Sequence, residues 1–281
     1  METHTEIVQR RRMPMLLGLL AVMALVASGC VFLPAAVNHN ENNPTTRPWW
    51  CHSTGNGGHH VDPAYAGMTK GMLTWQECFW LSAQFDLTID YAMQWPTLGD
   101  AEDAGFHRLV NYVEGMGTHH SMLGDFDPTD PSFDPTDPEF PGTEIDSTFH
   151  PARPEFLMYE GNSRSSELVG FAWYVKGDPT TPPEGFPGDN DWWHRHEVLC
   201  HQNSNWRVIG EDQSDTWCEN RGGTNVYLGD YWMTHAWILD GWQTRADVFT
   251  NHHPCLLPGG PATDPEDPCW DIANGGGGHG H

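Results

Sequence analysis

Residues 188–196 read Gly188-Asp189-Asn190-Asp191-Trp192-Trp193-His194-Arg195-His196, and this stretch decides the fold that we expect. On a helix, two histidines at positions i and i+2 point in different directions, whereas on a β-strand they point to the same face. His194 and His196 are therefore predicted to share one face of a strand over residues 192–200. A third histidine, His235, lies in a segment, 231–237, that also alternates like a strand.

The rest of the chain predicts an α+β fold, with N-terminal helices packed on a β-sandwich or on a small cupin-like β-barrel. Thr74 and Glu77 have the spacing of a capping box, which predicts a helix to about Met93. A second, shorter helix is expected over 100–113. From Phe156 the pattern changes to strands, and the segments 156–159 and 168–175 are predicted to form a hairpin. Further strands are expected at 206–209 and within 226–239.

We predict the following organisation from composition: a signal peptide at 1–29, a tether at 30–70, one metal-binding α+β domain at 71–272 and a flexible tail at 273–281. Within the domain, residues 126–147 contain a repeated Phe-Asp-Pro-Thr-Asp-Pro unit. Proline at this density forbids helix and central strand, so an acidic extended loop is expected there. Calcium binding by its carboxylates is the alternative, but the spacing lacks the glycine and bidentate glutamate of a loop site.

The N-terminal segment has the features of a bacterial lipoprotein signal. Arg10, Arg11 and Arg12 precede an almost wholly apolar run over 13–27, which is too short to span a bilayer comfortably. The run ends in Val26-Ala27-Ser28-Gly29-Cys30, which resembles a lipobox with Ala27 where leucine is preferred. We therefore expect Cys30 to be lipidated and to anchor the protein on the extracytoplasmic face of the membrane. Ordinary secretion, an uncleaved anchor and twin-arginine export are the alternatives.

The charge of the chain excludes one class of partner. The formal net charge at pH 7 is −25, with histidine counted as neutral. Such a surface repels phosphate backbones, so nucleic-acid binding is excluded as a prediction. The expected partners are the membrane, through the lipid anchor, and a metal ion or small molecule. No protein partner follows from the sequence.

The cysteines agree with export. Apart from Cys30 they are even in number, and in an oxidising compartment this predicts disulfides. The connectivity is open, but proximity in sequence favours the pairs Cys51–Cys78, Cys200–Cys218 and Cys255–Cys269. Cysteine metal ligands are the weaker alternative, since the chain has no Cys-x-x-Cys motif.

A histidine-lined metal site is the leading functional hypothesis. His194, His196 and His235 form its expected core, and His119 or His120, which follow Gly115-Met116-Gly117, completes it. Solvated histidines flanked by tryptophan are the alternative. Three or four imidazoles without a thiolate suit one transition metal ion, which could be zinc, copper, iron or manganese. Asp191, Glu197 and Glu211 are candidates to hold the ligands in place, since a ligating imidazole usually donates its other N–H to an oxygen.

Two resemblances follow from these motifs. The Gly188-x5-His194-x-His196 spacing is similar to the first motif of the cupin family, whose small β-barrels hold iron, manganese, zinc or copper. The acidic ligand of that motif is replaced here by Cys200 or His201, and the proline of the second motif is missing around 229–235. The blocks 115–120 and 190–200 also look like a group of exported actinobacterial proteins, which implies export and no particular reaction.

Whether the protein is an enzyme is left open by the sequence. Three histidines and an open coordination position would permit catalysis, whereas four would favour a structural or sequestering site. A metal carrier or storage protein is a further alternative. The second hypothesis is a non-enzymatic lipoprotein that binds a carbohydrate or small ligand by stacking on tryptophan. Its candidate residues cluster in the β half of the chain: Trp192, Trp193, Trp206, Trp217, Trp232, Trp237 and Trp242.

Overall fold

The computed structural model describes residues 47–52, 62, 65, 70–123 and 144–275. The chain divides into two compact units, Met1–Thr46 and Arg47–His281, and everything below concerns the second. The predicted signal peptide, Cys30, most of the tether, most of the acidic loop and residues 276–281 lie outside the described residues. Within the described ranges, no helix is both long enough and apolar enough to cross a membrane.

The longest helix is α2, Trp75–Ala92, and it begins where the capping box predicts. The Thr74 side chain accepts a hydrogen bond from the Glu77 N–H, and the Glu77 carboxylate accepts one from the Thr74 N–H. These two bonds satisfy N–H groups that have no partner inside the helix. The buried face of α2 carries Cys78, Leu81, Phe85, Thr88 and Ala92.

The other elements are short. The helices are η2 (Trp49–His52), α3 (Leu98–Asp103), α4 (Asp215–Glu219) and α5 (Pro268–Ala273). One sheet contains β1 (Phe106–Val113), β2 (Gly117–Met122), β3 (Phe156–Tyr159), β4 (Leu168–Lys176), β5 (Val198–Gln202), β6 (Val208–Glu211), β7 (Gly223–Tyr227) and β8 (Tyr231–Ala236). A second, two-stranded sheet pairs β9 (Leu256–Leu257) with β10 (Gly260–Pro261).

The eight strands have the order β7-β5-β6-β1-β2-β3-β4-β8, which confirms an α+β fold with a sandwich-like β core. The outer edge of β8 is paired once more, because His194 and Met233 exchange both backbone hydrogen bonds at 2.8 Å. The same segment continues into β5, whose residues Leu199 to His201 pair with β6. The segment 194–202 therefore joins β8, at one end of the sheet, to β5, the strand next to the other end, and the pairings from β5 through β8 form a ring.

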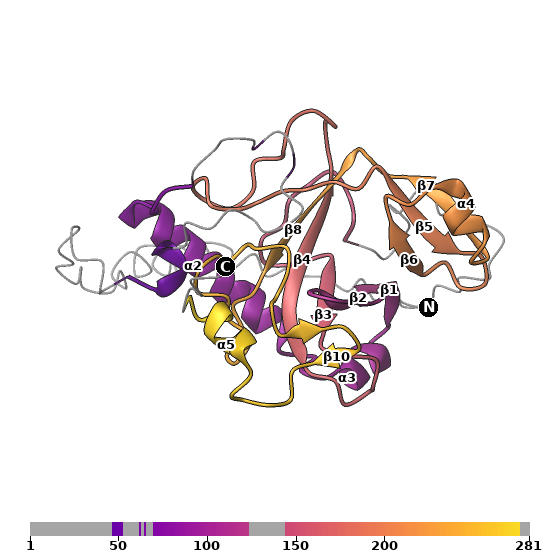
Figure 1. Cartoon of the computed structure of the whole chain (residues 1–281). Coiled ribbons are helices and arrows are strands. Elements are labelled where there is room, and N and C mark those ends of the chain that lie inside the picture. Colours follow the sequence, from indigo (N-terminus) through magenta and orange to yellow (C-terminus); the bar gives the residue numbers. More distant parts are fainter. Residues whose placement is uncertain (1–46, 53–61, 63–64, 66–69, 124–143, 276–281) are drawn as a thin grey trace, which may run out of the picture. The chain divides into compact units, whose positions relative to one another are not determined.

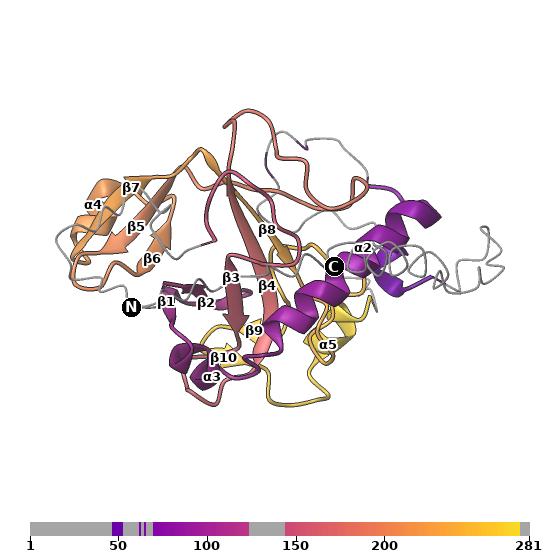
Figure 2. The ribbon, with the colours of Figure 1, turned by 180° about the vertical axis from the view of Figure 1, so that it is seen from behind.

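The sheet has two apolar faces, because neighbouring residues of a strand point to opposite sides. One face, with Leu157, Phe171 and Trp173, belongs to the core that includes α2. The opposite face, with Phe156 and Ala172, belongs to a second core that includes residues of β5, β6 and β7. Figure 1 shows α2 and the β5–β7 region with α4 on opposite sides of β4 and β8, and Figure 2 shows the same arrangement from behind.

Two of the expected elements differ from the structure. The helix expected over 100–113 ends at Asp103, because Gly105 adopts a φ of 98° directly after the C-cap residue Ala104. The aromatic and β-branched residues that follow form β1. The strand expected over 192–200 is regular only from Val198, and before it the backbone makes the single bridge at His194. The predicted hairpin is confirmed, since β3 and β4 pair antiparallel.

All three favoured cysteine pairs are disulfides: Cys51–Cys78, Cys200–Cys218 and Cys255–Cys269. The first ties the segment at 49–52 to the first turn of α2. The Trp50 indole donates to the Ser82 hydroxyl at 3.0 Å and packs edge-on against Phe85. The disulfide and the Trp50 contacts therefore fix the segment 49–52 to the core.

The turn between β1 and β2 provides a test of the sheet. Gly117 has a φ of 70°, and a Cβ there would lie 2.3 Å from the carbonyl oxygen of Tyr159 on β3. We expect Gly117→Ala to lower the free energy of unfolding by about 3 kcal/mol, from left-handed backbone strain and from the clash. Urea denaturation monitored by circular dichroism measures this loss.

Gly222→Ala is the matched control. Gly222 has a φ of 72°, and nothing lies within 4 Å of the position that its Cβ would take. This variant should lose only the strain contribution, about 1 kcal/mol. Equal losses in the two variants would contradict the close packing of β2 against β3.

Candidate metal centre

Four of the predicted site histidines meet on the inner side of the ring. His119 comes from β2, His235 from β8, and His194 and His196 from the segment that closes the sheet. The ring centroids of His119 and His235 are 5.6 Å apart, those of His194 and His235 5.3 Å, and those of His194 and His196 5.2 Å. All four side chains are buried, with at most 6% of their surface exposed. We call these four residues the histidine cluster.

In the histidine cluster, the Nε2 atoms of His119 and His235 are 3.4 Å apart. One ring can donate a hydrogen bond to the other at this distance, although it is longer than the usual range of about 2.7–3.2 Å. Two imidazole nitrogens bonded to one tetrahedral ion at about 2.0–2.1 Å would be about 3.3–3.4 Å apart. The pair is therefore spaced as two ligands of one ion would be.

Small residues on β4 leave room for this approach. Ala172 pairs with Phe156 on one side and with His235 on the other, so all three lie on the same face of the sheet. Gly170 lies two residues away, and a Cβ there would be 2.7 Å from Met158 Cε and from the Trp237 ring. Larger side chains at Gly170 and Ala172 would fill the space over β4 in which His119 and His235 approach each other.

His196 is held by carboxylates. Its Nδ1 is 3.0 Å from Asp212 Oδ2, and its Nε2 is 3.7 Å from Glu211 Oε2. The other oxygen of Asp212 accepts hydrogen bonds from the backbone N–H groups of Glu197 and Val198. Asp212 thus fixes the closing segment and the His196 ring together. It does so with a φ of 50°, an uncommon value for a residue other than glycine that often marks functional sites.

Burial and neighbouring charges shift the pKa values of the clustered imidazoles in opposite directions. Burial lowers the pKa of His119 to about 3, and the neighbouring His196 adds to this effect. Burial also lowers the pKa of His235, well below its ordinary value. For His196, burial acts in the same direction but Asp212 and Glu211 outweigh it, so its pKa is raised. His119 and His235 are therefore neutral, which is the form that binds metals.

Among the described residues, no three His, Cys, Asp or Glu side chains already gather around one point as metal ligands. The His119–His235 pair has the spacing of two ligands. Among the described groups, the buried Nδ1 of His119 has no hydrogen-bond partner, whereas a hydrogen bond between the Asn251 side chain and the His235 ring partly opposes the lowering of the His235 pKa. Binding of an ion would require the rings of His194 and His196 to turn toward this pair.

The remaining predicted residues lie elsewhere. His120 points to the opposite face of β2, where its ring meets Tyr159 edge-on and Arg108 donates to its Nε2 at 3.5 Å. Of the two adjacent histidines, His119 is thus the one in the histidine cluster. Glu197 pairs with Arg195 at 3.3 Å, whereas Glu211 does lie beside His196. The sequence analysis did not identify Asp212 as a site residue, because its contact with His196 depends on the turn after β6.

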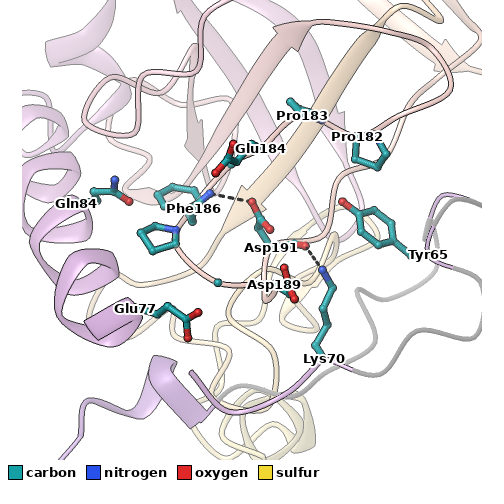
Figure 3. A pocket seen from close by; sticks show the side chains of 13 residues that line it. Tyr65, Lys70, Glu77, Gln84, Pro182, Pro183, Glu184, Phe186, Asp189 and Asp191 are labelled. Carbon is teal, nitrogen blue, oxygen red and sulfur yellow. Dashed lines mark hydrogen bonds between the residues drawn. The ribbon is translucent and has the colours of Figure 1, made fainter. Parts of the chain in front are cut away.

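Asp191 belongs to a different site. Its Oδ2 accepts hydrogen bonds from the Phe186 N–H and from the Trp193 indole, both at 2.9 Å. It lines a cavity of about 820 Å³ next to α2 (Figure 3). There the Lys70 ammonium donates to the Asp191 carbonyl at 2.9 Å and lies over the Tyr65 and Trp192 rings. Asp191 therefore stabilises the loop before the closing segment and does not touch a ligand candidate.

Most of the tryptophans proposed as a binding surface lie in the core. Trp192, Trp193, Trp232, Trp237 and Trp242 expose at most 8% of their surface. Trp206 and Trp217 are half-buried, and the Trp217 ring is covered by the Arg221 guanidinium at 3.9 Å. The described residues of the β half therefore present few open stacking platforms for a sugar.

The comparisons with known proteins add no identity, since no family model, curated protein or solved structure matches the chain. The resemblances to cupins and to exported actinobacterial proteins stay predictions from the motifs quoted above.

The burial of Asp191 predicts a specific pH dependence of stability. Burial raises the pKa of its carboxyl to about 6, against an ordinary value of 3.8. Between these values the folded protein holds a proton that the unfolded chain has released, so the contribution of Asp191 to stability falls as the pH rises. The loss is about 3 kcal/mol and is complete above the folded pKa. Asp191→Asn should therefore gain stability relative to the wild type between pH 4 and pH 7.

Urea denaturation of both proteins at several pH values measures this gain. Asp189→Asn removes an exposed carboxylate of the same cavity and should follow the wild-type pH profile. Parallel profiles for wild type and Asp191→Asn would show that Asp191 is not the group that titrates there.

Proposed function

We propose that the mature protein is a membrane-tethered lipoprotein that holds one transition metal ion among His119, His194, His196 and His235. The observation that carries the proposal is the 3.4 Å separation of the His119 and His235 Nε2 atoms inside a buried group of four imidazoles. The chain positions these rings from three separate segments, β2, β8 and the closing segment.

The alternative is a core that happens to contain histidines. Burying a polar group without a hydrogen-bond partner costs free energy, and a core tolerates few such groups. His119 Nδ1 is one such buried nitrogen, but other buried polar atoms, such as Ser121 Oγ and Thr234 Oγ1, also have no partner among the described groups. Unpartnered nitrogens alone do not distinguish the two cases, because an ion bound at Nε2 would leave each Nδ1 as an N–H donor that still needs an acceptor. The metal site is favoured by the 3.4 Å spacing of the His119 and His235 Nε2 atoms, which is that of two ligands of one ion.

The contact between Asp212 and His196 supports the same proposal. Metal-binding histidines almost always donate their other ring N–H to a carboxylate, a carbonyl or water, which sets the tautomer and the ring orientation. Asp212 occupies this place at Nδ1 of His196, so Nε2 is the nitrogen that would bind an ion. Glu211, near that Nε2, could supply an oxygen ligand in addition.

The ligand set narrows the choice of metal. The cysteines among the described residues that could supply thiolates are paired in disulfides, so the available donors are imidazole nitrogens and carboxylate oxygens. These donors suit zinc, copper, iron or manganese. When bound, such an ion would act as a Lewis acid or redox centre, and the cluster residues would hold and orient it. Enzyme, carrier and storage protein remain the three classes that this site could serve.

Metal analysis of two neighbouring variants tests the proposal. His119 and His120 are adjacent on β2 and both buried, but only His119 points into the histidine cluster. We expect His119→Gln to lose stoichiometric metal after reconstitution and His120→Gln to keep it, as measured by mass spectrometry of the purified proteins. Thermal unfolding checks that both variants fold. A His119→Gln variant with full metal content would remove the basis of the proposal.

The role of Asp212 is tested by Asp212→Asn. The amide can still accept the backbone hydrogen bonds, but it no longer stabilises the donor tautomer of His196 with a charge. Loss of such a partner typically weakens metal binding by about 10–100-fold. Competition with a chromophoric chelator measures the affinity, and Asp271→Asn, which removes an exposed carboxylate of α5, is the control. Equal affinities for the two variants would show that Asp212 only shapes the backbone.

A further inference from the structure

The histidine cluster is closed off from solvent on most sides. None of its four side chains exposes more than 6% of its surface. An ion that reaches these nitrogens must therefore follow a path that the other described residues leave open.

A cleft of about 480 Å³ lies between β1 and β6, and none of the four clustered histidines lines it directly. It exists because β1 and β6 pair at a single position, Val110 with Val208, and because the register of β1 is irregular on both sides of Val110. The two strands therefore separate beyond this pair. The lining consists of residues 110–113 of β1 and residues 208–213 of β6 and the turn after it.

Two residues of the cleft contact the histidine cluster. Asp212 and Glu211 line the cleft, and both contact His196. The exposure of these side chains decreases inward, from 48% for Asp212 to 23% for Glu211 and 6% for His196. Two other cavities, those next to Asp191 and to Trp242, are lined in part by residues of α2 on the other face of the sheet.

The charge of the cleft is suited to a cation. Its lining contains the carboxylates of Glu211 and Asp212 and no lysine or arginine. Clefts lined by one sign of charge concentrate ions of the opposite sign and raise their association rates by roughly 10–10³-fold. The net charge of −25 acts in the same direction at longer range. A phosphate or carboxylate ligand would be repelled along the same path.

We infer that this cleft is the route by which a divalent metal cation enters and leaves the histidine cluster, with Asp212 and Glu211 as the first groups it meets. The inference rests on the proposed function, since it presupposes that the cluster binds a metal. It adds that exchange of the ion is controlled at the β1–β6 gap and not at the face covered by α2.

The kinetics of Co²⁺ uptake by the full-length protein test the route. Cobalt bound by nitrogen and oxygen donors absorbs in the visible range, so loading can be followed by stopped flow and release by adding excess chelator. The variant Ile209→Trp enlarges a half-buried residue of the cleft wall. We expect it to slow loading and release by the same factor, about tenfold, with the amount of bound cobalt at equilibrium unchanged. Leu87→Trp, an equally bulky change at an exposed position of α2, is the control.

A second variant tests the charge of the cleft without the bulk that Ile209→Trp adds. Gln213→Lys introduces a cation into the wall, whereas Thr216→Lys adds the same charge at an exposed position of α4. Loading should be slower in Gln213→Lys by about tenfold at low salt, and added salt should reduce the difference. The amount of cobalt that the His119→Gln protein binds is subtracted from each measurement, because it represents binding outside the histidine cluster.

The cobalt measurements distinguish a failure of the proposed function from a failure of the entry route. Wild-type protein that binds no cobalt beyond the His119→Gln background would overturn the proposed function. Cobalt that binds in the cluster, with wild-type rates in both Ile209→Trp and Gln213→Lys, would overturn the entry route alone. A slower rate in Leu87→Trp instead would place the route at α2.

Discussion

The pair of backbone hydrogen bonds between His194 and Met233 is the interaction on which the rest of the site depends. It attaches the closing segment to the free edge of β8, while the same segment continues into β5 and pairs with β6. Without it, β8 would present an unpaired edge, and His194 and His196 would belong to a loop. With it, residues of β2, of β8 and of the segment that leads into β5 lie on one inner face. Asp212 secures the other end of the same short stretch by binding three successive residues, His196 to Val198.

The interior of this ring combines two environments that shift imidazole pKa values in opposite directions. Around His119 and His235 the neighbours are mainly apolar or aromatic, so burial dominates and both rings are neutral. Around His196 two carboxylates are close enough to outweigh burial. A gradient of this kind places neutral ligands deep in the protein and negative charge toward solvent. That is the order in which a cation that loses its hydration shell would need to meet them.

Much of the fold could be predicted from local sequence signals, and the site could be predicted only in part. The capping box of α2, the β3–β4 hairpin and the three disulfides depend on residues close together in the chain, so spacing alone identifies them. The i, i+2 spacing of His194 and His196 also indicated a shared side, although the backbone there is a single bridge. The choice between His119 and His120 depends on the register of β2 with β3, which no local pattern reveals. Asp212 was missed for a similar reason, since its contact with His196 arises from the pairing of β5 with β6.

The incorrectly predicted helix over 100–113 had a consequence for function. If residues 106–113 formed a helix, they would indicate nothing about the site. As β1, the same residues form one wall of the cleft, and their irregular register is what leaves the gap beside β6. A regular β1–β6 ladder would stabilise the sheet further and would close this gap. The single β1–β6 pair is therefore the structural basis of the cleft, and the entry route proposed above depends on it.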